Sequence, residues 1–69
     1  MRLSARNQLE GTVVSVQLGA VMATVVIRLA GGQELVSAIT KDSVESLGLR
    51  EGDSVTAFIK STEVIVGKD

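Results

Sequence analysis

The sequence predicts an all-β domain. Short runs rich in valine, isoleucine and threonine recur along its 69 residues, with eleven valines against a single aromatic residue, Phe58. β-Branched residues in short runs favour strands over helices. Glycine-containing turns separate the runs, and proline is absent from the chain. The length leaves room for one domain, residues 1–69, and for no second.

The first predicted strand runs from Gln8 to Gln17. Side chains alternate between the two faces of a strand. Strict alternation places Val14 and Val16 on one face and Val13 and Ser15 on the other.

Two further strands follow in the first half of the chain. The turn Leu18–Val21 leads to a strand at Ala23–Leu29. Ala30–Gln33 is the clearest hairpin signal, because its adjacent glycines adopt positive φ at little cost. The third strand then covers Glu34–Ile39.

One short helix is predicted at Thr40–Leu47. Thr40 is a suitable N-cap, since its hydroxyl oxygen can accept a hydrogen bond from the first turn. Val44 and Leu47 are three residues apart and are expected to share the inward face. Gly48 followed by Leu49 is typical of a Schellman-type helix end. Two turns are not stable alone, so we expect this helix to close one end of a barrel.

Two strands complete the pattern. After the polar turn Glu51–Asp53, the segment Ser54–Lys60 alternates well and is predicted as strand four. Ser61–Thr62 interrupts the run, and Glu63–Val66 is predicted as a short fifth strand. Five strands with a small helix between the third and the fourth is the order of an OB-like barrel.

Composition excludes most catalytic chemistry. The chain has no cysteine and no histidine, so the usual ligands of zinc and the usual general base are missing. No base is evident that could activate a hydroxyl or lysine nucleophile. We therefore expect neither an enzyme nor a zinc, haem or nucleotide cofactor.

Charge and hydropathy limit the partners. The net charge is −1 and the pI about 5.3, whereas nucleic-acid binding by an OB-like barrel needs a basic groove and stacking aromatic residues. We expect no nucleic-acid partner. No segment approaches the roughly 20 apolar residues of a membrane span, and the first residues lack the apolar stretch of a secretory signal. These features predict a cytoplasmic protein without a membrane partner, although a mature exported form with its signal already removed would look the same.

The apolar content predicts an oligomer. Hydrophobic residues make up 45% of the chain, and so small a domain has much surface for its volume. Part of this apolar material is expected at contacts between subunits. The alternative is a well-filled monomeric barrel, which the low charged fraction of 22% disfavours.

Three polar groups offer hydrogen-bond donors without a carboxylate at their centre. Such a set suits a fully ionised oxyanion, which accepts hydrogen bonds and donates none. Taken singly, each member also has a structural explanation, as a helix cap, a strand break or a surface charge. The groups are Ser4-Ala5-Arg6-Asn7, Thr40 with Ser43, and Lys60-Ser61-Thr62.

These motifs together resemble the molbindins, the small cytoplasmic molybdenum-pterin-binding (Mop) proteins with a TOBE/Mop-type barrel. The resemblance covers essentially the whole chain. Related domains occur in molybdate-responsive regulators and in molybdate-transporter ATPases, but this chain has no helix-turn-helix and no P-loop. It therefore resembles the stand-alone storage form. The segments that carry the likeness are Ser4–Leu9, Gly19–Val21, Ile39–Ser43, Leu47–Leu49, Glu51–Gly52 and Lys60–Ser61.

The resemblance implies a homo-hexamer, built as a trimer of dimers, with molybdate or tungstate at the subunit interfaces. By position, one subunit contributes Ser4, Ala5 and Arg6, with Asn7 in the same motif. The neighbouring subunit contributes Thr40, Ser43, Lys60 and Ser61.

The resemblance also implies a second, axial site at the turn Gly19, Ala20 and Val21. Met22 stands here where the family usually has an asparagine. If that asparagine contributes to binding, the axial site of this chain is weak or absent.

Elementary chemistry agrees with a molybdate site. Hydrogen phosphate carries a proton that a donor-only site cannot accept, and an unmatched buried donor costs roughly 1–3 kcal/mol. Sulfate has the same charge as molybdate and is smaller, so its rejection depends on cavity size. Tungstate should bind comparably. The alternative function is a structural, oligomerising module without a working anion site.

Overall fold

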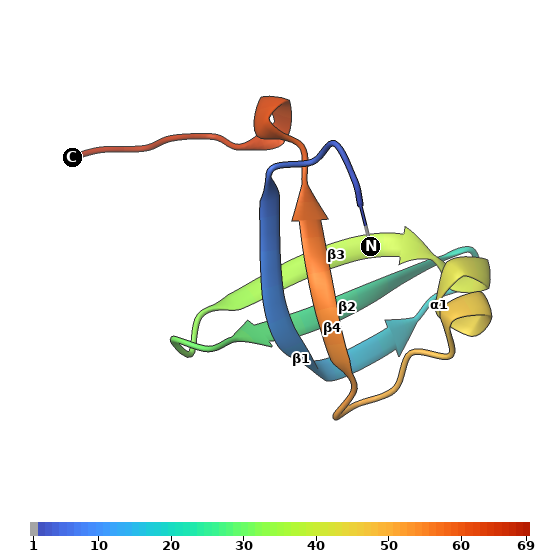
Figure 1. Ribbon diagram of the computed structural model, residues 1–69. Helices are drawn as coiled ribbons and strands as arrows, with labels where there is room; N and C mark the ends of the chain where they lie inside the picture. The colour runs from blue at the N-terminus through green and yellow to red at the C-terminus, as the bar shows by residue number, and fades with distance from the viewer. Residues whose placement is uncertain (1) are drawn as a thin grey trace.

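The computed structural model describes residues 2–69 as a curled, four-stranded antiparallel sheet with one short helix (Figure 1). The strand order is β3-β2-β1-β4. The predicted all-β fold is confirmed, and each of the first four predicted strands agrees with the structure to within one residue at either end. The elements are β1 (Asn7–Leu18), β2 (Met22–Leu29), β3 (Glu34–Thr40), α1 (Lys41–Leu47), β4 (Ser54–Ile59) and the 3₁₀ turn η1 (Ser61–Glu63).

Strand β1 contains a bulge that the sequence pattern did not reveal. Val13 lies opposite Ile27 in β2, but the next paired residue is Ser15, opposite Val26. The extra residue resets the alternation, so Val13 is buried and Val16 also packs against the core. The prediction that Val13 and Val16 lie on opposite faces is therefore wrong. β1 bends sharply along its length (Figure 1), as strands with bulges do.

Helix α1 has the predicted ends. The Thr40 side chain accepts a hydrogen bond from the Ser43 N–H at 3.0 Å, which satisfies a first-turn donor. Gly48 takes the left-handed conformation, with φ of 63°. The Leu49 N–H then donates to the carbonyl of Val44 at 3.1 Å, the bond that defines the Schellman motif.

The inward face of α1 is narrower than predicted. Val44 is buried in the core, but Leu47 is 69% exposed, so the prediction that both face inward is wrong for Leu47. Leu47 instead borders an apolar groove that opens beside the helix. The buried core is small and entirely aliphatic; it consists of Val13, Ala23, Val25, Ile27 and Val44.

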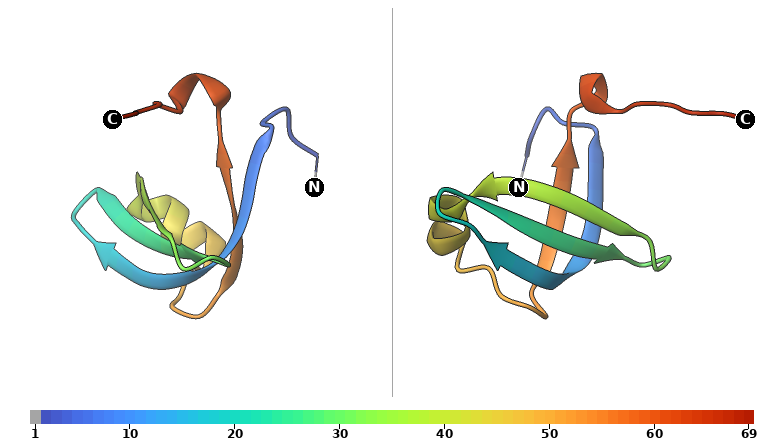
Figure 2. Two further views of the ribbon diagram at one scale, coloured as in Figure 1. Left: turned by 90° about the vertical axis from the view of Figure 1, so that its left-hand side faces the viewer. Right: turned by 180° about the vertical axis from the view of Figure 1, so that it is seen from behind.

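The predicted fifth strand, Glu63–Val66, is wrong for this chain. Glu63 ends the turn η1, and the residues after it pair with no strand among residues 2–69. The segment leaves the barrel after η1 and extends away from it in every view (Figures 1 and 2). β3 and β4 therefore remain the two outer strands of the sheet, and each has one unpaired edge.

Over residues 2–69, none of the helical segments is long and apolar enough to cross a bilayer.

Candidate functional site

Five of the predicted oxyanion-binding residues line one open hollow of about 520 Å³. The sheet register explains why they meet. Asn7 lies opposite Ile59 in the β1–β4 pair, so the residues before Asn7 and after Ile59 leave the sheet at the same end. The lining consists of Leu3, Ser4, Ala5, Arg6, Phe58, Lys60, Ser61 and Thr62.

Two neighbouring side chains hold this end of the sheet together. The Asn7 amide donates to the Ile59 carbonyl at 3.2 Å, joining β1 to the last residue of β4. Asn7 is half-buried and does not line the hollow. Gln8 donates from Nε2 to the Ala5 carbonyl at 2.9 Å. This bond occupies an acceptor that would otherwise be free to repel an anion.

The hollow is rich in donors and has no acidic side chain in its lining. Arg6 and Lys60 are both exposed, and the ion pair formed within residues 2–69, between Arg28 and Glu34, involves neither of them. The Lys60 carbonyl accepts from the Glu63 N–H at 2.9 Å within η1. The N–H groups at the start of a helical turn have no partner inside it. Positive charge, hydroxyls and free N–H groups are what an oxyanion requires.

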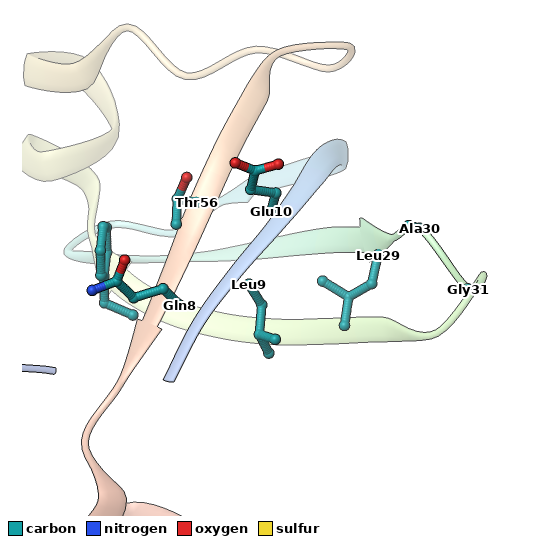
Figure 3. A pocket seen from close by; sticks show the side chains of 8 residues that line it. Gln8, Leu9, Glu10, Leu29, Ala30, Gly31 and Thr56 are labelled. Atoms are coloured by element: carbon teal, nitrogen blue, oxygen red, sulfur yellow. The ribbon is translucent and has the colours of Figure 1, made fainter. Parts of the chain in front are cut away.

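A second hollow of similar size is lined by a carboxylate and by no cationic side chain. It lies over the β1–β4 pair, where Glu10 is opposite Thr56 and both side chains point to the same side (Figure 3). Gln8, Leu9 and Leu29 also line it. The Glu10 carboxylate would repel an anion, and no cation lines this hollow to offset it. Charge therefore favours the hollow at the end of β4.

Thr40 and Ser43 are in a different part of the chain. They lie where β3 passes into α1 and do not line the hollow at the end of β4. The Thr40 hydroxyl donates to Ser43 Oγ at 2.8 Å. Two hydroxyls that share one hydrogen bond retain one unused proton, so this pair can still donate once to a ligand.

The turn Gly19–Val21, predicted as the axial site, lies beside the start of α1. The Lys41 N–H donates to the Val21 carbonyl at 2.8 Å. The Gly19 N–H is already bonded to the Met22 carbonyl at 2.8 Å, so one expected donor is engaged inside the turn. Val21 and Met22 are 71% and 48% exposed. The turn thus presents mainly apolar side chains.

Three residues that line the hollow were not among the oxyanion-binding residues predicted from the sequence. Phe58 could have been identified, because alternation along strand four puts it on the same face as Lys60. Thr62 had a signal too, since it adjoins Ser61 and carries a hydroxyl. Leu3 had none. Over residues 2–69 no three acidic, cysteine or histidine side chains cluster in a way that could hold a metal cation.

The chain matches known proteins over almost its full length. The TOBE domain family matches residues 3–66. Molybdenum-pterin-binding protein 3 of Clostridium pasteurianum is 53% identical over 66 residues, which cover 96% of this chain and 97% of that protein.

Solved structures agree with this similarity. A molybdate-binding protein from Sporomusa ovata superposes with a TM-score of 0.93 at 51% identity, covering 99% of this chain and all of that one. The cytoplasmic molybdate-binding protein ModG, solved with molybdate bound, superposes with a TM-score of 0.90 at 51% identity. That match covers 94% of this chain and 46% of the ModG chain.

Proposed function

The chain belongs to the TOBE domain family and, within it, to the small molybdenum-pterin-binding (Mop) proteins, and from that membership we propose that it binds molybdate. The hollow at the end of β4 supports this proposal most directly. It combines two cations and three hydroxyls, and no carboxylate lines it. The carbonyls of Ala5, Lys60 and Ser61 already accept hydrogen bonds. This chemistry selects a fully ionised oxyanion over a cation or a protonated ligand.

We further propose that the complete site forms between subunits of a homo-oligomer, a hexamer built as a trimer of dimers. Lys60 and Ser61 share one hollow with Ser4, Ala5 and Arg6 of the same chain, and Thr40 and Ser43 lie outside it. This differs from the expected division, which grouped Lys60 and Ser61 with Thr40 and Ser43 on the neighbouring subunit. A second chain is then needed to bring its Thr40–Ser43 pair to the same ion. Exposed apolar side chains such as Val21, Val36 and Ile65 supply contact surface for such an assembly.

The physiological role that follows is storage or buffering of the oxyanion in the cytoplasm. The role involves no catalysis, nucleotide, haem or zinc, and no membrane or nucleic-acid partner. Tungstate has the charge and nearly the size of molybdate, so it should bind with similar affinity.

Titration calorimetry at physiological salt tests the proposal. Molybdate should bind, with at least tenfold weaker binding of sulfate, because the smaller ion cannot reach all donors at once. Equal binding of the two ions, or binding of neither, would leave the chain as an oligomerising module without a working anion site.

Lys60→Ala tests where the ion sits. Loss of a hydrogen bond to a charged group costs about 1.5–3 kcal/mol, so molybdate affinity should fall about tenfold to a hundredfold. Lys68→Ala is the matched control, because Lys68 is exposed and lines none of the described hollows. Normal molybdate affinity in the Lys60 variant would rule out the hollow as the site.

A further inference from the structure

One face of the β1–β4 pair carries opposite charges at its two ends. Glu10 lies opposite Thr56, and Lys60 continues the line of β4 with an extended backbone, φ of −65° and ψ of 136°. Lys60 is four positions beyond Thr56, about 13 Å along a strand, and an even spacing places both side chains on the same face. Arg6 lies at the same end as Lys60, since both line one hollow. A glutamate and a lysine can meet over such a distance when both side chains lie flat on the sheet.

These opposite charges are nevertheless not paired with one another. The ion pair formed within residues 2–69 joins Arg28 to Glu34 and involves neither Glu10 nor Lys60. Glu10 and Lys60 are both exposed, so burial does not hold them apart. The hollow at the end of β4 therefore keeps its cations available, although a carboxylate projects from the same face.

Phe58 lies between the two ends of this face. Within residues 2–69, Phe58 is the residue that lines both the cationic hollow and the hollow that contains Glu10. It is two positions from Thr56 and two from Lys60, so its ring projects on the same side as theirs. It is half-buried, whereas Glu10 and Lys60 are exposed. The ring is thus a boundary that the two hollows share.

Gln8 completes this boundary on the neighbouring strand. It lies directly opposite Phe58, and residues paired in this way have Cβ atoms about 4.5–5.5 Å apart on one face. The Gln8 amide donates from Nε2 to the Ala5 carbonyl at 2.9 Å, which anchors the side chain. Phe58 and Gln8 together form a wall across the face, with the carboxylate on one side and the cations on the other.

We propose that Phe58 is a positioning residue of the oxyanion site, which acts by keeping the Glu10 carboxylate from pairing with Lys60. The same wall separates Glu10 from Arg6. A carboxylate of the chain itself that reached these cations would compete with the oxyanion for the same charged donors. The inference rests on the proposed function, because it assigns Phe58 a role at that same site.

A double-mutant cycle, measured by calorimetry with molybdate at physiological salt, tests this role. Phe58→Ala removes the ring, and the ion pair that then forms should weaken molybdate binding about twofold to fivefold, the strength of an exposed pair. Glu10→Gln in the Phe58→Ala background should recover that loss. Glu10→Gln alone should leave the affinity unchanged, because exposed charges farther apart than about 8 Å are largely screened at this salt.

Two further variants control for charge and for folding. Glu51→Gln removes the same charge from an exposed turn residue that lines none of the described hollows, and it should change the affinity in neither background. Phe58→Val also removes the ring but keeps a residue that favours strands, so it should show the same loss and the same recovery. β-Sheet circular dichroism identifies which variants are folded.

The outcomes separate this inference from the proposed function. An unaltered chain that binds no molybdate would overturn both. Full affinity in both Phe58 variants, or a loss that Glu10→Gln does not recover, would overturn the role of Phe58 and leave molybdate binding standing. An equal gain from Glu10→Gln with and without Phe58 would also overturn it, since Glu10 would then act by general repulsion and not by pairing.

Discussion

At the scale of single residues, the carbonyls around the hollow matter as much as its cations. An anion is repelled by a free acceptor, and three of the carbonyls at this end of the sheet already accept hydrogen bonds. Gln8 occupies the Ala5 carbonyl, and the turn η1 occupies those of Lys60 and Ser61. If the hollow holds an oxyanion, Gln8 would assist binding without lining the hollow, because its amide engages the Ala5 carbonyl.

Gly11 is the residue at which a side chain is least tolerated. An added Cβ would lie 2.6 Å from both the Arg28 carbonyl oxygen and Ile27 Cγ2. Backbone and a packed core side chain cannot move aside cheaply, and overpacking of this kind typically costs about 1–3 kcal/mol. Gly11→Ala should lower the free energy of unfolding by that amount in urea titrations.

Gly67→Ala is the matched control for Gly11, because an added Cβ there meets no atom within 4 Å. Equal stability of the two variants would mean that β1 and β2 can separate locally without cost.

At the scale of elements, Thr40 caps α1 and is also one of the proposed ligand donors. Thr40→Ala removes the oxygen that accepts from the Ser43 N–H, and loss of such a cap costs about 1 kcal/mol. Thr40→Ser keeps the hydroxyl and should unfold like the unaltered chain. Urea titration of both variants measures the difference. Equal destabilisation by alanine and serine would trace the effect to the lost methyl group.

Local patterns were sufficient to predict most elements. Alternation, glycine turns and the cap and stop residues of the helix located four strands and α1 to within one residue. The bulge in β1 was not predictable, because an extra residue appears only when Val13 and Ser15 are matched to their partners in β2. Likewise, the spacing of Leu47 from Val44 predicts an inward-facing side chain, but Leu47 is exposed at the border of a groove. The groove exists because the sheet is open there, which the sequence does not reveal.

The predicted fifth strand had a sound local basis. Glu63–Val66 carries a strand-like apolar run, yet a strand forms only where an edge is available to pair with it. Within its own chain, η1 directs the segment away from both free edges. The sequence thus contains the propensity for a strand, but no free edge of the same chain lies within its reach. For the candidate site, the three donor groups were identified from sequence, but the pairing of the first group with Lys60–Thr62 in one hollow was not.

At the scale of the whole molecule, the chain has little interior of its own. Among residues 2–69, five aliphatic residues are buried, whereas ten large hydrophobic residues are exposed. With neither disulfide nor structural metal cluster in residues 2–69, a domain of this size ordinarily gains stability from a partner. Assembly and ion binding would then both stabilise the same native state.

That coupling predicts a thermal response to the ion. A ligand that binds only the native assembly stabilises it by RT ln(1 + [L]/Kd), about 2.7 kcal/mol at a hundredfold excess over Kd. Molybdate should raise the melting midpoint by several degrees at fixed protein concentration, and sulfate should raise it less. Fixed concentration matters because the midpoint of an oligomer depends on it. If equal concentrations of sulfate and molybdate gave equal shifts, the stabilisation would be a general salt effect, and the hollow would have no selectivity for the larger oxyanion.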